Sequence, residues 1–135
     1  MEFQGPVHRV RVRYCEMDRM AVAHHGSYVA WFEEARLEWI RARGKAYKQM
    51  EDEGNLMMVV DFACRYHKPV DYDDVVAIRL RIAETGKAAV TIEYEARRES
   101  DGEVCATGST KLACVGRDGK PRRLPPEFAV PPAAR

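Results

Sequence analysis

Apolar and polar residues alternate along several stretches of the chain, which is the pattern of strands that bury one face. In residues 8–14, Val10, Val12 and Tyr14 fall on one face and three arginines fall on the other. The same alternation predicts strands over residues 57–66, 75–83, 87–99 and 103–115. Residues 100–102, Ser-Asp-Gly, separate the last two and suit a hairpin turn, because Asp-Gly tolerates positive φ. We therefore expect about five strands in mostly antiparallel succession.

A different period predicts one long helix over residues 27–43. Its apolar positions recur at steps of three and four, which places them on one stripe of a helix. Ser27 is a candidate N-cap and Gly44 a candidate stop signal after the last turn. The stripe consists of Tyr28, Trp31, Phe32, Ala35, Trp39 and Ala42.

These lengths fit an α+β fold in which a long antiparallel sheet curls around the single helix. The 135 residues are enough for one domain, residues 1–135, and the proline-rich residues 124–135 read as an extended tail. One helix covers only one face of such a sheet, so we expect a homo-oligomer, either a homodimer or a homotetramer.

Charge and composition exclude several classes of function. The 22 basic and 21 acidic residues give a net charge of +1, which argues against nucleic acid as a partner. No apolar run approaches the length of a membrane-spanning helix, and no signal-like apolar segment follows the first residues. The four cysteines form no CxxC pair and match no zinc pattern. We expect a cytoplasmic protein with reduced thiols and no bound metal.

The segment between the first strand and the helix carries the candidate chemistry. Asp18 follows the strand, and His24, His25 and Gly26 open the helix. The first amides of a helix are unpaired donors, and a nearby carboxylate can act as base or nucleophile toward a carbonyl bound there. By spacing alone, Asp18 fits equally well as a loop cap or as the partner of an arginine. The two histidines fit equally well as members of a turn with a hydrogen-bonded imidazole.

Residues 14–36, YCEMDRMAVAHHGSYVAWFEEAR, resemble the opening motif of the 4-hydroxybenzoyl-CoA thioesterase-like family, which has the hotdog fold. Further similarity lies in residues 62–70, 71–74 and 119–125, so the resemblance covers nearly the whole chain. It implies hydrolysis of an acyl-CoA thioester without a cofactor. It also implies that Asp18 is the base or nucleophile and that the backbone amide of His25 polarises the carbonyl. The chain departs from the family at Ala21, where glycine is common.

The resemblance also suggests which residues bind the substrate. Tyr28 and Met58 are candidates for the wall of an acyl pocket. Lys87, Arg122 and Arg123 are candidates for contacts with the phosphates of CoA. Two other functions stay open at this stage: a non-catalytic module that binds acyl-CoA or an acyl-carrier protein, and a hydratase or dehydratase of acyl thioesters.

Overall fold

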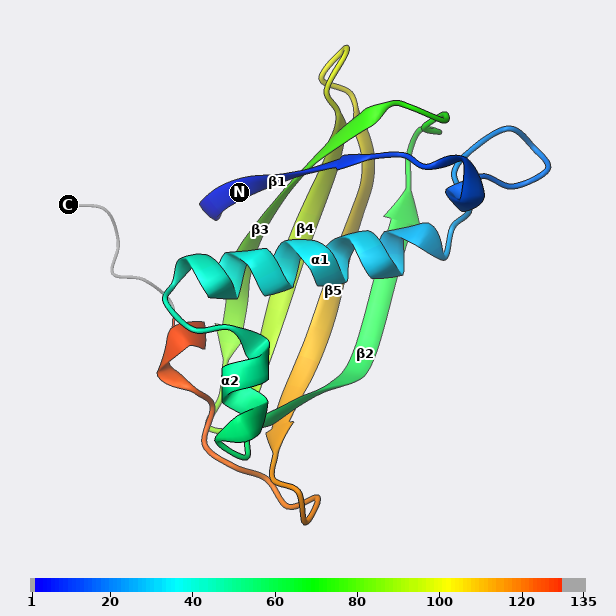
Figure 1. Ribbon diagram of the computed structural model, residues 1–135. Coiled ribbons are helices and arrows are strands. Elements are labelled where there is room, and N and C mark those ends of the chain that lie inside the picture. The colour runs from blue at the N-terminus through cyan, green and yellow to red at the C-terminus, as the bar shows by residue number, and fades with distance from the viewer. Residues whose placement is uncertain (1, 130–135) are drawn as a thin grey trace.

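The computed structural model describes residues 2–129 and contains one antiparallel sheet with two helices (Figure 1). The sheet order is β1-β3-β4-β5-β2, so β1 and β2 are its edge strands. Each of the four neighbouring pairs is antiparallel. The strands are β1 (Gln4–Arg11), β2 (Leu56–Tyr66), β3 (Val75–Thr85), β4 (Ala89–Arg98) and β5 (Val104–Val115). The helices are α1 (Ser27–Ala42) and α2 (Tyr47–Asp52), with 3-10 turns at Tyr14–Glu16 and Pro126–Phe128.

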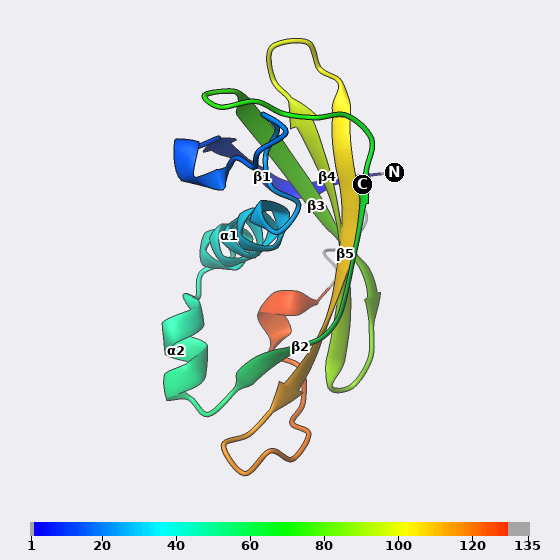
Figure 2. The same ribbon diagram turned by 90° about the vertical axis from the view of Figure 1, so that its right-hand side faces the viewer.

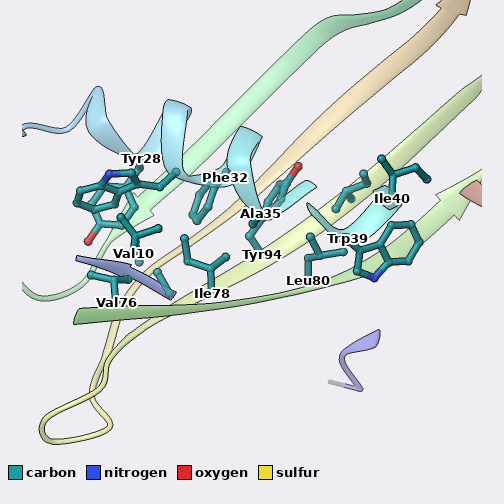
Figure 3. Packing of buried hydrophobic residues seen from close by; sticks show 14 of the residues in the cluster. Val10, Tyr28, Phe32, Ala35, Trp39, Ile40, Val76, Ile78, Leu80 and Tyr94 are labelled. Atoms are coloured by element: carbon teal, nitrogen blue, oxygen red, sulfur yellow. The ribbon is translucent and has the colours of Figure 1, made fainter. Parts of the chain in front are cut away.

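Helix α1 lies on the concave side of the curved sheet, whose other face carries no helix of the described chain (Figure 2). The apolar stripe of α1 points at the sheet, and its side chains meet those of β1, β3 and β4 (Figure 3). Trp31, Phe32 and Ile40 are completely buried. The predicted α+β architecture, a long sheet wrapped around one helix, is confirmed. Neither described helix is long and apolar enough to cross a membrane.

The position of α1 over the sheet depends on a close approach at Gly108. The ring of Phe32 stacks on that of Tyr94, with centroids 4.5 Å apart and planes 7° from parallel. A Cβ atom on Gly108 would lie 2.7 Å from the Phe32 ring and 2.8 Å from the carbonyl oxygen of Ala63. Glycine in β5 therefore lets the aromatic face of the helix rest directly on the strand.

Several boundaries differ from the sequence prediction. The first strand ends at Arg11, and Tyr14 belongs to the 3-10 turn that follows it. The helix begins at Ser27 as predicted, but its N-cap is Gly26 and the Ser27 hydroxyl donates to the carbonyl of Glu16 instead. Gly44, with φ of 104°, does follow the helix as expected.

The proline-rich end of the chain is described as far as residue 129. It contains the 3-10 turn Pro126–Phe128, and the side chain of Phe128 is completely buried. The Phe128 ring packs edge-on against Tyr47 of α2. The rest of the predicted tail lies outside the described residues.

Candidate active site

Asp18 and His25 lie on the loop between β1 and α1, and both line one cavity of about 290 Å³. Tyr28, from the first turn of α1, forms part of the same wall. Residues 66–70, the end of β2 and the segment after it, supply another part of the wall. The fold therefore brings three of the predicted site residues together: Asp18, His25 and Tyr28.

The Asp18 loop is a tight turn that is closed by its own hydrogen bonds. The Asp18 amide donates to the carbonyl of Val22 over 2.9 Å, and the Ala21 amide donates back to the Asp18 carbonyl over 3.2 Å. Ala21 has φ of 61°, which is the left-handed conformation that favours glycine. One carboxylate oxygen of Asp18 accepts the Met20 amide over 2.8 Å. Among residues 2–129 the other oxygen has no hydrogen-bond partner, so it is available to a substrate or a water molecule.

Glu16 fixes the position of this loop against the helix. Its side chain is 8% exposed and accepts the indole N–H of Trp31 and the backbone N–H of Arg13, each over 2.7 Å. Its carbonyl accepts the His24 amide over 2.7 Å. Burial opposes ionisation, but the bonds from Arg13 and Trp31 outweigh it and hold the pKa of the Glu16 carboxyl below its ordinary value.

The amides at the start of α1 are not equivalent. The Gly26 N–H donates to Nδ1 of His24 over 3.0 Å, and the Ser27 N–H donates to the His24 carbonyl over 2.9 Å. Within the part of the chain that the structure describes, the His25 N–H has no acceptor. Because His25 lines the cavity together with Asp18, the wall of this cavity offers both a free amide donor and a free carboxylate oxygen, the two groups that acyl transfer to a bound carbonyl needs.

Sequence reasoning missed the wall that residues 66–70 provide. The hydroxyl of Tyr66 donates to the carbonyl of His25 over 2.9 Å. A ring nitrogen of His67 lies 3.1 Å from the Thr107 hydroxyl, and the Lys68 ammonium lies 3.5 Å from Glu103. The family resemblance included this segment, but nothing in the local pattern indicated that it would face Asp18.

Tyr28 is almost completely buried, at 3% exposure, and burial is the main cause of its raised pKa. Its ring packs edge-on against those of Trp31 and Tyr66. The Tyr28 hydroxyl therefore stays protonated at neutral pH. This side chain belongs to the core, as a member of the apolar stripe, and it also lines the cavity.

The other predicted binding residues lie elsewhere in the chain. Met58, 51% exposed, is near the start of β2. Arg122 donates to the side chain of Asn55 over 2.9 Å. The Leu124 amide donates to the carbonyl of Lys87. Arg123 follows Arg122 directly and therefore lies in the same region, near the start of β2. β2 runs from Leu56 to Tyr66, so at a rise of about 3.3 Å per residue these groups are about 30 Å from the cavity. Within one protomer they do not contribute to it.

No group of three or more His, Cys, Asp or Glu side chains among residues 2–129 is arranged to hold a metal ion. The rings of His24 and His25 lie 4.2 Å apart, and the Nδ1 atom of His24 is occupied by Gly26. The polar side chains that line the cavity are one carboxylate, two imidazoles, two phenols and one ammonium group, which belong to Asp18, His25, His67, Tyr28, Tyr66 and Lys68.

Comparison with known proteins identifies the family. Residues 20–105 match the model of the thioesterase superfamily. The chain belongs to the thioesterase superfamily. The resemblance found in the sequence, the hotdog fold and the assignment to a family of thioester-hydrolysing enzymes are thereby confirmed. The matched residues include His25 and Tyr66 and begin just after Asp18.

Named relatives agree with this assignment. The chain is 30% identical over 107 residues to the acyl-CoA thioesterase YbgC of Haemophilus influenzae, covering 78% of this chain and 77% of the relative. It is 28% identical over 118 residues to the acyl-CoA thioester hydrolase YbgC of Escherichia coli, covering 86% and 87%. Among solved structures, the DHNA-CoA thioesterase from Staphylococcus aureus has a TM-score of 0.84 and 36% identity. That match covers 87% of this chain and 79% of the other.

Proposed function

We propose that this thioesterase-superfamily protein hydrolyses acyl-CoA thioesters at the cavity between Asp18 and His25. The observation that carries the proposal is that Asp18 and His25 line the same cavity, while the His25 N–H and one Asp18 oxygen have no hydrogen-bond partner among residues 2–129. The names of the relatives support acyl-CoA as the substrate class.

In the proposed reaction the thioester carbonyl oxygen accepts a hydrogen bond from the His25 amide. The partial positive charge at the start of α1 adds to this, because negative charge develops on that oxygen in the transition state. Asp18 either attacks the carbonyl carbon directly or removes a proton from an attacking water molecule. If Asp18 activates water, the new carbon–oxygen bond forms to the water oxygen, the carbon–sulfur bond breaks, and the proton that Asp18 removed passes to the leaving thiolate. If Asp18 attacks directly, the carbon–sulfur bond breaks to leave a mixed anhydride with Asp18, which a water molecule then hydrolyses while the thiolate takes up a proton from that water. Either route consumes one water molecule, and the products are a free acid and CoA.

The two edges of the sheet differ in a way that bears on assembly. β1 contains Gly5 and Pro6 and has an irregular register with β3, features that discourage pairing with another chain. β2 is 11 residues long and exposes Met58, Val59 and Val60. A long apolar edge is a template for another strand. We therefore propose a homodimer formed through β2, on its own or as half of a homotetramer.

Pairing through β2 would also explain the distant binding residues. Two identical edges related by a two-fold axis run antiparallel, so the start of one β2 lies beside the end of the other. Tyr66 of one protomer would then lie near Leu56 of the partner subunit. Four predicted binding residues would approach the cavity across this interface: Met58, Lys87, Arg122 and Arg123 of the partner subunit.

A cytoplasmic location is also part of the proposal. The four cysteines are all free, and Cys105 and Cys114 are buried. Unpaired thiols are typical of a reducing compartment.

The activity is tested by measuring thiol release from a panel of acyl-CoAs with the wild-type protein, with Asp18→Asn and with Asp52→Asn. Asp52 is an exposed carboxylate on α2 and serves as the matched control. We expect Asp18→Asn to lose about 10² to 10⁴ in rate while Asp52→Asn stays at the wild-type level. Wild-type turnover by folded Asp18→Asn would contradict the assignment. Tight binding of acyl-CoA without release would indicate a binding module instead.

A further inference from the structure

The hydroxyl of Tyr66 connects the end of β2 to the residue that carries the free amide. It donates to the carbonyl oxygen of His25 over 2.9 Å, and both residues line the cavity that Asp18 also lines. Tyr66 and His25 are 41 residues apart in the chain, so this contact exists only in the folded protein.

The His25 carbonyl has no comparable partner within the helix. The Tyr28 N–H is 3.4 Å from it, near the limit for a hydrogen bond. The Val29 N–H, which would reach His25 in regular helical geometry, donates to Gly26 over 3.2 Å instead. The bond from Tyr66 is therefore the best hydrogen bond that this carbonyl makes, and it restrains the His25–Gly26 peptide group, which adjoins the peptide group that carries the free N–H.

Tyr66 is held on one side, although the residue as a whole is 48% exposed. Its ring packs edge-on against the buried ring of Tyr28, with centroids 5.5 Å apart. Desolvation raises the pKa of Tyr66 to about 12, and the Cys64 thiol contributes in the same direction. The hydroxyl thus keeps its proton at neutral pH and can act as a donor throughout the physiological range.

We infer that Tyr66 is a positioning residue of the hydrolytic site, whose hydroxyl holds His25 so that its amide points at the substrate carbonyl. The inference rests on the proposed function and adds to it a part supplied by β2. A fixed donor stabilises the transition state better than a mobile one, because no reorganisation is needed when charge develops. Tyr66 acts through His25 and need not contact the reacting atoms.

The test is Tyr66→Phe, which keeps the ring against Tyr28 and removes only the hydroxyl. The matched control is Tyr72→Phe, since Tyr72 is 52% exposed and its hydroxyl has no hydrogen-bond partner in the described chain. We expect kcat of Tyr66→Phe to fall about 10- to 100-fold, because small misplacements of catalytic groups reduce rates by factors of this size. KM should change by less than about 2-fold, because the lost interaction stabilises the transition state and not the bound substrate. Tyr72→Phe should behave as wild type.

A double variant separates action through His25 from a direct role. In a His25→Pro background the amide is already absent, so Tyr66→Phe should reduce kcat little further. Wild-type kcat in Tyr66→Phe, a rise of KM with unchanged kcat, or full additivity with His25→Pro would each overturn the inference.

A spectroscopic measurement does not depend on activity. The His25 carbonyl and the Gly26 nitrogen belong to one peptide group, so loss of the Tyr66 bond should shift the Gly26 amide resonance. An unshifted Gly26 resonance in Tyr66→Phe would overturn the inference, whatever the rates. If the wild-type protein hydrolysed no thioester, the proposed function would fail, while this resonance would still decide whether Tyr66 holds His25.

Discussion

At the scale of single residues, the backbone conformation of Ala21 shows how the Asp18 loop is built. The family resemblance raised the question whether alanine could replace glycine there. Ala21 adopts φ of 61°, and the hydrogen bonds that close the turn around Asp18 are formed. The hydrogen-bonded turn therefore forms with alanine at this position, and the cost falls on stability because an L-residue is strained in this conformation.

We predict that Ala21→Gly stabilises the protein by up to about 1 kcal/mol, since relief of the strain is partly offset by the greater freedom of glycine in the unfolded chain. Urea unfolding would measure this. The control is Ala83→Gly in β3, an exposed strand position, where the same change should destabilise by about 0.5–1 kcal/mol. Loss of stability in Ala21→Gly would show that the strain is absent.

Glu16 should make folding depend on pH. Its pKa is lowered in the folded protein, so its contribution is present above the ordinary carboxyl value and is lost as pH falls through the folded value. We predict that Glu16→Gln lowers the free energy of unfolding by about 1–3 kcal/mol at neutral pH, which is the usual effect of losing hydrogen bonds to a charged group. The difference from wild type should shrink below about pH 4. Denaturant titrations at a series of pH values would check this, and a constant difference at all pH values would contradict it.

At the scale of elements, hydrophobic periodicity predicted most of the fold. The strands expected over residues 75–83, 87–99 and 103–115 are β3, β4 and β5, within a few residues at each end. The first strand was misplaced because Gly5 and Pro6 interrupt its alternation. The order of strands could not be predicted, because β2 pairs with β5 across about 50 residues of chain, and alternation carries no information about partners.

In the site too, residues that are close in the sequence could be grouped by prediction, whereas residues brought together by the fold could not. Asp18, His25 and Tyr28 lie within 11 residues of one another, so a local motif was enough to group them. Tyr66 and its neighbours reach the cavity only through the folding of the sheet. The hydrogen bond from Trp31 to Glu16 could not be predicted either. The position of Trp31 in the helical stripe indicates a core residue and gives no sign of a polar partner.

The packing of α1 on β5 yields a further prediction at this scale. Gly108→Ala places a Cβ atom 2.7 Å from Phe32 and 2.8 Å from the backbone oxygen of Ala63, which cannot move aside easily. We predict a loss of about 1–3 kcal/mol in stability, the usual cost of overpacking. Gly86→Ala is the control, because its nearest neighbour would lie at 3.8 Å and no large effect is expected. Equal unfolding midpoints for the two variants would contradict this account of the packing.

At the scale of the whole molecule, the uncovered edge of β2 predicts an assembly. One chain has a mass of 15.4 kDa, and sedimentation of the wild-type protein at micromolar concentration should give at least twice this mass. Val60→Lys places a charge on this edge and should shift the protein toward monomer with loss of activity. Val29→Lys is the control, since Val29 on α1 is exposed to a similar degree, 49% against 52%. A monomeric and active wild-type protein would contradict the proposed interface.

The pairing of Asp18 with a free backbone amide is the feature on which the proposed chemistry depends. His25 is the second residue of a turn in which the Ser27 N–H donates to the His24 carbonyl over 2.9 Å. Proline is favoured at this position of a turn, so His25→Pro removes the amide hydrogen at a place where the backbone commonly accommodates proline. His25→Ala instead keeps the amide and removes only the imidazole.

The most direct measurement is therefore kcat for thiol release by His25→Pro and His25→Ala, with both variants shown to be folded by circular dichroism. We predict that His25→Ala stays within about 10-fold of wild type, whereas His25→Pro loses about 10² to 10³, the usual cost of one oxyanion donor. If alanine is as damaging as proline, the imidazole and not the amide activates the carbonyl. If the proline variant retains wild-type kcat, the amide has no part in the reaction.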